Sequence, residues 1–274
     1  MTYVYAWFSA NNDYAVGTPG YFSTVLSSNV RIESTATRRA GIIRFTYPTT
    51  EDETYTILVD LANDLGRSFH GGSLQIYGSE SPEEGSRVEL SGTYLQVDLY
   101  CCYLDNCADM MQLQSYGPDN YTAYGCYILP PSANTSNLYA TYQPSAGNSN
   151  IEIALNGSSL DFGYTPDTQD IEAGALMTYP ASQTGETMIE IKFGISMRST
   201  QQACANLRDE LKSEDGLYFT FENIQDAAEA EWEGVLGRVD LPNVDQEDQD
   251  IVTMLYSSVS VHSKISLDYL WLTI

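Results

Sequence analysis

Short runs of aromatic and β-branched residues, each of strand length, recur through the first 198 residues. The Pro19-Gly20 pair before one of them is typical of a turn, because Pro fixes φ and Gly accepts a positive φ. Many short strands separated by turn residues predict an antiparallel sandwich or barrel. Residues 156–186 contain few aliphatic side chains, so we expect long surface loops with one strand there. The predicted strand runs are 21–26, 41–47, 55–61, 73–77, 87–90, 94–100, 123–129, 151–155 and 187–197.

The pattern changes after residue 198, where a Ser-Thr pair suited to a helix N-cap precedes apolar residues at helical spacing. A second helix is expected to begin at residue 222 or 223. The acidic run 245–250 would stand at the start of a third helix, where negative charge complements the helix dipole. We therefore predict a helical segment over 199–244 after the β-rich part of the chain.

Acidic residues dominate the charge of the chain, with 37 Asp and Glu against 12 Lys and Arg and a formal net charge of −25. Nucleic acids and anionic membrane surfaces attract positively charged proteins. We therefore expect neither as a partner. The sequence also contains no apolar segment of the roughly 18 residues that a transmembrane helix needs. The composition remains compatible with neutral sugars and with divalent cations as ligands.

Four of the five cysteines lie close together, at positions 101, 102, 107 and 126. Local disulfides among them are expected in an oxidising compartment. Cys107 and Cys126 are the candidate partners of Cys101 and Cys102, and the sequence leaves the pairing open. Cys204 falls in the first predicted helix, and we expect it to be a buried free thiol.

The composition also bears on where the protein works. Tyr, Ser and Thr are plentiful, and N-glycosylation sequons begin at Asn120, Asn134 and Asn156. These features favour a secreted, extracellular protein. The first residues lack the basic region and the apolar run of a signal peptide.

Several motifs in a fixed order point to a known family. The first two are Gly17-Thr-Pro-Gly-Tyr-Phe22 and the segment 34–48, which reads Ser-Thr-Ala-Thr-Arg-Arg-Ala-Gly-Ile-Ile-Arg-Phe-Thr-Tyr-Pro. Related motifs follow at 56–61, 193–211 and 232–256. Together they resemble the N-terminal domain of the glycoside hydrolase family 92 α-mannosidases over about residues 8–256.

This resemblance implies a mainly β fold, a large antiparallel sandwich of the galactose-mutarotase-like supersandwich type. Residues 1–198 would form the sandwich, 199–244 a helical linker, and 245–274 the start of an (α/α)6 catalytic domain that the chain does not complete. The family's enzymes are calcium-dependent, inverting exo-α-mannosidases whose catalytic carboxylates and most calcium ligands lie in that barrel. The implied role is therefore a non-catalytic, carbohydrate-binding or structural domain, inactive alone and holding no complete calcium site. Its implied partners are mannose-containing glycans and the barrel.

The family's pocket lies between the two domains, and the resemblance places one of its segments at residues 8–22. Ala10 stands where the family has a histidine, and no catalytic residue is carried over. Trp7 and Asp13 are the candidate sugar contacts. The arginines of the second motif, Arg38, Arg39 and Arg44, are interpreted as partners in structural salt bridges.

Two other functions remain open. A stand-alone carbohydrate-binding module predicts a polar groove with a stacking aromatic ring. A self-contained hydrolase predicts two carboxylates about 6.5–9.5 Å apart across a pocket. The family reading instead predicts exposed apolar side chains, on the sandwich and around Trp232, Leu255 and Leu270-Trp271, where the barrel would pack.

Overall fold

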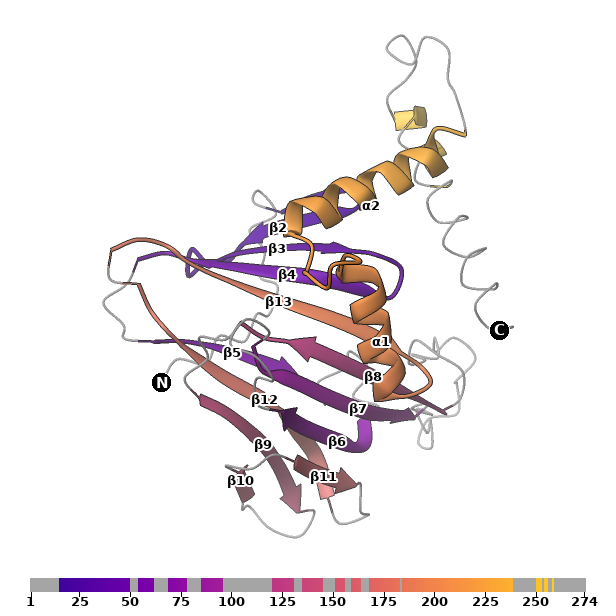
Figure 1. Ribbon diagram of the computed structural model, residues 1–274. Helices are drawn as coiled ribbons and strands as arrows, with labels where there is room; N and C mark the ends of the chain where they lie inside the picture. Colours follow the sequence, from indigo (N-terminus) through magenta and orange to yellow (C-terminus); the bar gives the residue numbers. More distant parts are fainter. Residues whose placement is uncertain are drawn as a thin grey trace, which may run out of the picture.

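The computed structural model describes residues 15–49, 54–61, 69–77, 85–95, 120–130, 135–144, 151–155, 159–163, 168–182, 184–238, 250–252, 254–255 and 258. In these residues the chain forms two antiparallel sheets and a pair of helices (Figure 1). None of the described helices has the length and apolar character needed to cross a membrane.

The larger sheet has nine strands in the order β1-β2-β3-β4-β13-β8-β7-β6-β11. Strand β13 lies near its middle and pairs with β4 on one side and β8 on the other. In that order the strands are β1 (Val16–Thr18), β2 (Tyr21–Val25), β3 (Arg31–Ala36), β4 (Ala40–Tyr47), β13 (Thr187–Ser196), β8 (Asn120–Ile128), β7 (Arg87–Leu95), β6 (Phe69–Tyr77) and β11 (Ser159–Gly163).

The smaller sheet has four strands in the order β10-β9-β12-β5. Its strands are β10 (Ile151–Leu155), β9 (Thr135–Pro144), β12 (Thr168–Pro180) and β5 (Thr54–Asp60). The prediction of long loops with one strand over 156–186 is wrong, because this stretch contains two strands, β11 and the 13-residue β12, and β12 pairs with both β9 and β5. The residues at alternate positions of β12 from Ala173 to Tyr179 are fully buried.

The main hydrophobic core lies between the two sheets. Side chains at every second position point into it, as the pleat of a strand requires, and β13 contributes Ile189 and Ile191. Tyr47 of the larger sheet stacks on Tyr55 of the smaller sheet, with ring centroids 4.2 Å apart. The protein therefore has the mainly β, antiparallel sandwich fold that was predicted. We call this buried cluster the sandwich core, and its members are Val30, Tyr47, Tyr55, Ile57, Leu61, Leu74, Val88, Leu90, Leu129, Ala173, Ala175, Met177, Tyr179, Ile189 and Ile191.

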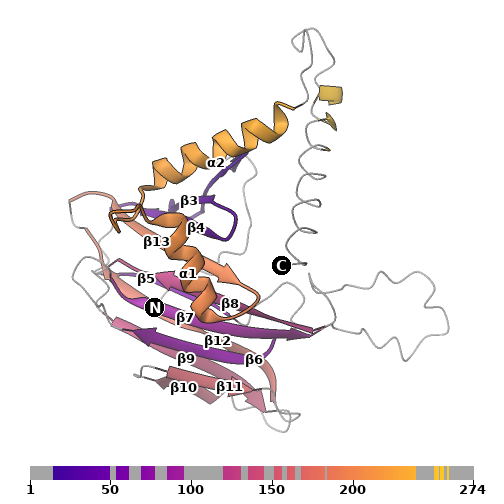
Figure 2. The same cartoon turned by 45° about the vertical axis from the view of Figure 1, so that its right-hand side comes forward.

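Two helices cover the other face of the nine-stranded sheet (Figures 1 and 2). Helix α1 (Thr200–Leu211) begins where predicted, and the Ser199 hydroxyl oxygen accepts a hydrogen bond from the Gln202 amide as its N-cap. Helix α2 (Phe221–Leu236) begins slightly earlier than predicted, after a capping box formed by Thr220 and Asn223. We call this pair of helices, with the face of the sheet beneath them, the helical layer. It has a core of its own, formed by Ala40, Ile42, Cys126, Ala203, Cys204, Leu207, Leu211, Phe221 and Ile224.

A disulfide joins Cys126 of β8 to Cys204 of α1 inside this second core. The prediction of a free thiol at Cys204 is therefore wrong, and Cys126 is not bonded to Cys101 or Cys102. The two half-cystines are 78 residues apart in sequence, with Cα atoms 5.1 Å apart. Only the packing of α1 on the sheet brings them together, so sequence proximity favoured the wrong partners. Cys101, Cys102 and Cys107 lie outside the described residues.

Candidate functional site

The Gly-Thr-Pro-Gly-Tyr-Phe motif forms the β1–β2 turn, and this turn packs directly against α2. Gly20 has a φ of +83°, which favours glycine. A Cβ atom at Gly20 would lie 2.9 Å from the Ala228 Cβ atom and from the Glu229 amide nitrogen. The Thr35 hydroxyl donates a 2.8 Å hydrogen bond to the Gly20 carbonyl oxygen and so attaches the turn to β3. Glycine is therefore required at position 20 for two reasons: the backbone conformation there and the close contact with the helix.

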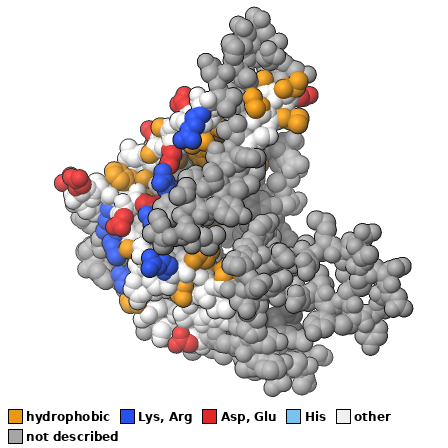
Figure 3. Space-filling model, turned by 90° about the vertical axis from the view of Figure 1, so that its right-hand side faces the viewer, with side chains coloured by type: hydrophobic (Ala, Val, Ile, Leu, Met, Phe, Trp, Pro, Cys, Tyr) orange, Lys and Arg blue, Asp and Glu red, His pale blue; other side chains and the backbone are white. Residues whose placement is uncertain are grey.

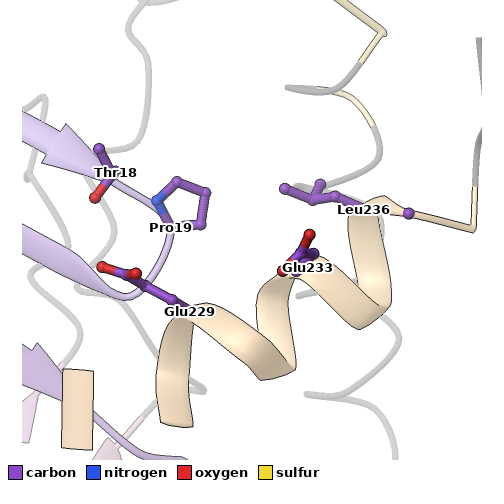
Figure 4. A pocket seen from close by; sticks show the side chains of 6 residues that line it. Thr18, Pro19, Glu229, Glu233 and Leu236 are labelled. Carbon is purple, nitrogen blue, oxygen red and sulfur yellow. The ribbon is translucent and has the colours of Figure 1, made fainter. Parts of the chain in front are cut away.

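A cavity of about 450 Å³ opens between this turn and the C-terminal half of α2 (Figure 4). Two glutamates one helical turn apart, Glu229 and Glu233, stand on its α2 side, with Pro19 across from them. The Gln225 amide donates a 2.8 Å hydrogen bond to Glu229. The full lining is Thr18, Pro19, Glu229, Glu233, Leu236 and Gly237.

The chemistry of the cavity suits a ligand with both hydroxyl groups and an apolar face. Ionised carboxylates only accept hydrogen bonds, so Glu229 and Glu233 would take them from hydroxyl donors. Pro19 and Leu236 supply apolar surface beside these acceptors. Pockets that bind small molecules commonly combine apolar walls with a few placed polar groups. This cavity is therefore the candidate ligand site among the described residues.

The adjacent arginines of the second motif form ion pairs with the two helices. Arg38 pairs with Glu231 of α2 at 2.7 Å, and both side chains are more than half exposed. Arg39 pairs with Glu210 of α1 at 2.7 Å, and Glu210 also accepts hydrogen bonds from the Thr37 hydroxyl and the Arg39 amide. Burial alone would raise the pKa of the Glu210 carboxyl, but these hydrogen bonds and the Arg39 charge together lower it.

Arg44 lies at the centre of a more buried group. Its side chain is only 13% exposed and pairs at 2.7 Å with Glu190 of β13 and with Glu222 of α2. The guanidinium also lies over the Phe221 ring, 4.2 Å from its centroid. The hydrogen bond from Arg44 lowers the pKa of the Glu222 carboxyl. The predicted structural salt bridges are thus confirmed for all three arginines. Arg44 ties strand β4 to α2, and Arg38 and Arg39 tie the β3–β4 turn to α2 and α1.

One group of possible metal ligands is found among the described residues. Their only group of three possible metal ligands within reach of one another consists of Glu89, Cys126 and Cys204. Calcium takes oxygen ligands, and two of these three residues are bonded to each other through sulfur. The donor set therefore does not fit calcium.

The candidate residues from the sequence are not placed by the structure, because Trp7 and Asp13 lie outside the described residues. They remain predictions. Sequence reasoning did not identify Glu229 and Glu233. Their spacing of four residues does place both on one side of a helix, which could have been noticed. Nothing in the sequence says that this side meets the Pro19-Gly20 turn.

Comparison with known proteins identifies the family. A family model for the glycosyl hydrolase family 92 N-terminal domain matches residues 2–196. The chain therefore belongs to the family of glycosyl hydrolase family 92 N-terminal domains. It is also 26% identical over 228 residues to an uncharacterized secreted glycosidase of Arthroderma benhamiae. That match covers 81% of this chain and 25% of the relative, so the chain spans about a quarter of the relative's length.

Solved structures of the same family share the fold. The family 92 glycosyl hydrolase ccman5 superposes with a TM-score of 0.60 at 19% identity, covering 91% of this chain and 28% of that one. A family 92 α-mannosidase from Bacteroides thetaiotaomicron gives 0.59 at 16% identity, covering 92% and 27%. A family 92 inverting mannosidase from the same species gives 0.53 at 17% identity, covering 85% and 24%. In each case this chain matches only a small part of the larger protein.

Proposed function

We propose that this chain is the non-catalytic N-terminal part of a family 92 glycoside hydrolase that removes α-mannosyl residues from glycans. Its role would be to present part of the sugar-binding surface and to position a C-terminal (α/α)6 catalytic domain. The observation that carries the proposal is the packing of the family's Pro19-Gly20 turn on α2, which forms the cavity with Glu229 and Glu233. Membership of the family and the mannosidase structures with the same fold support it.

The surface near the end of α2 suits a partner domain. Trp232 is only partly buried, and farther along the chain Ile251 and Met254 are 64% and 70% exposed. Figure 3 shows a group of hydrophobic side chains in the upper part of one face. Exposed apolar side chains that lie together commonly mark an interaction surface. We infer that the catalytic domain packs here.

Two further parts of the proposal concern calcium and location. The family's reaction depends on calcium, and we propose that the ion is held by the catalytic domain, because the donor set described here does not fit it. Calorimetry with calcium on this chain alone should therefore detect no stoichiometric binding.

We further propose that the protein is extracellular. Its similarity to a secreted glycosidase and its disulfide both favour an oxidising compartment.

The first experiment compares turnover of a chromogenic α-mannoside, with calcium, by this chain and by a longer chain that includes the catalytic domain. We expect turnover only by the longer chain. Turnover by the 274-residue chain itself would contradict the proposal and favour a self-contained hydrolase. In the longer chain, Glu229→Gln with Glu233→Gln should weaken substrate binding. Glu214→Gln is the matched control, because Glu214 is exposed and does not line the cavity.

A stand-alone carbohydrate-binding module is the second candidate, and one observation favours it. The cavity already combines two carboxylates, those of Glu229 and Glu233, with apolar surface from Pro19 and Leu236. Titration of the isolated chain with mannose and α-mannobiose, followed by NMR, separates the two functions. Saturable binding that the double glutamine variant abolishes would favour the module. Binding that appears only in the longer chain would favour the proposed division between two domains.

A further inference from the structure

The disulfide lies in only one of the two cores of the molecule. Cys126 and Cys204 are 1% and 5% exposed and belong to the core of the helical layer. Neither residue belongs to the sandwich core, which lies on the opposite face of the nine-stranded sheet. The disulfide therefore constrains the packing of α1 directly and the packing of the two sheets only indirectly.

The disulfide attaches α1 to a different strand from the other contacts of this helix. Asn206 donates a 2.7 Å hydrogen bond to the Ile195 carbonyl oxygen at the end of β13. At Gly194 a Cβ atom would collide with the Ala203 carbonyl oxygen, so the helix rests directly on the strand. These contacts hold α1 on β13, whereas the disulfide reaches β8 on the far side of that strand. It joins α1 at the middle of the helix and prevents it from lifting away as a unit.

The surroundings of the disulfide oppose its spontaneous exchange with thiols. The Cys204 sulfur lies 3.4 Å from the Glu89 carboxylate. The same carboxylate oxygen pairs with Arg87 at 3.1 Å, and the negative charge that this pair leaves beside the sulfur disfavours the thiolate form, which both attacks and leaves in thiol–disulfide exchange. Burial also keeps a reductant away until α1 opens locally. Reduction should therefore be slow in the closed state and accelerated by anything that loosens the helix.

We propose that the Cys126–Cys204 disulfide is a redox-sensitive latch on the helical layer. A small dithiol supplies two electrons and two protons and becomes a cyclic disulfide, while Cys126 and Cys204 become two free thiols. In the reduced state α1 loosens most and α2 less, because α2 reaches the same core through Phe221 and Ile224. The sandwich core keeps its packing. The redox state of the surroundings thereby controls how firmly the two helices are held on the sheet.

Hydrogen–deuterium exchange with peptide-level mass spectrometry tests this on the full chain, before and after treatment with dithiothreitol. Amides of 200–211 should exchange at least about tenfold faster after reduction, and those of 221–236 should show a smaller increase. Amides of 54–60 and 173–180, which lie in strands of the smaller sheet, should not change. Equal exchange of 200–211 in both states would overturn the proposal. An acceleration of 54–60 and 173–180 equal to that of 200–211 would also overturn it, as would failure of dithiothreitol to reduce this bond without denaturant.

The double variant Cys126→Ala with Cys204→Ala separates this bond from the other cysteines. Without reductant it should already exchange as the reduced protein does, and dithiothreitol should add nothing over 200–211. A dithiothreitol effect over 200–211 that persists in this variant would assign the change to other cysteines and overturn the proposal. Should the variant fail to fold, pulse labelling of the reduced native chain gives the same comparison. Glu89→Gln should speed reduction by dithiothreitol, and an unchanged rate would contradict the role given to the carboxylate.

Discussion

The two faces of the nine-stranded sheet are covered in different ways. The sandwich core contains large aliphatic and aromatic side chains from both sheets, such as Leu74, Leu129 and Tyr179. The helical layer has a smaller core, and specific ties hold its helices to the strands and turns of the sheet: a disulfide, three arginine–glutamate contacts and glycines at close approaches. Non-directional burial tolerates variation in detail, whereas each specific tie depends on one residue. We therefore expect substitutions in the sandwich core to lower the stability of the whole protein. Substitutions at the ties should loosen the helical layer locally, each independently of the others.

The largest effect should come from removing a buried side chain of the sandwich core. Met177 of β12 is fully buried, and Met177→Ala should lower the free energy of unfolding by about 2–5 kcal/mol, because it leaves a cavity between the sheets. Urea denaturation measures the change. Met188→Ala is the matched control, since Met188 is 60% exposed and its truncation should cost little. Equal losses in the two variants would show that β12 does not lie in the core.

The next effect concerns the turn that packs on α2. Gly20→Ala should cost about 1–3 kcal/mol, because alanine would have to adopt the positive φ of this position and its methyl group would collide with Ala228 and Glu229. The loss should appear in exchange of α2 before it appears in the sheets. Gly17→Ala in the adjoining strand β1 is the control, since nothing lies within 4 Å of its Cβ position. A neutral Gly20→Ala variant would contradict the close approach of turn and helix.

A smaller effect is expected from the ion pairs. Arg44→Met should cost about 1–2 kcal/mol, because it leaves the partly buried Glu190 with only the longer, 4.0 Å contact to Lys192. Arg38→Met should cost less than about 1 kcal/mol, because both Arg38 and Glu231 are more than half exposed. Thermal unfolding of the two variants, side by side, compares the buried and the exposed tie. A larger loss of stability in the Arg38 variant than in the Arg44 variant would contradict the greater contribution expected from the buried ion pairs.

The smallest effect is a pH dependence carried by Glu210. Its pKa is lower in the folded protein than the value of about 4.3 for an unperturbed glutamate. The stabilisation is therefore complete above the unfolded-state pKa and is lost as the pH falls through the lower folded-state pKa. Glu210→Gln should reduce the fall in melting temperature between about pH 5 and the acid end of the titration. Parallel curves for the two proteins would show that Glu210 contributes nothing to it.

Most strands of the larger sheet could be predicted, because their residues combine strand propensity with clear turn signals. Strands β2, β4, β8 and β13 lie close to the predicted ranges. Strand β12 could not be predicted in this way, since Ala173, Gly174 and Ala175 have little strand propensity. These small residues are buried because a neighbouring strand lies on either side of them and the other sheet lies above. That information is not local to the segment.

The sequence by itself determined the mainly β class, the first helix with its Ser199 cap, and the family resemblance in the motifs at 17–22 and 34–48. Each of these rests on neighbouring residues, through alternation, capping or a turn. Only the tertiary structure decided that Cys204 bonds Cys126, that Gly20 touches α2, and that Glu229 and Glu233 line a cavity with Pro19. These relations join residues far apart in the chain. They follow from the register of the sheet and the way the helices cross it, which no local pattern encodes.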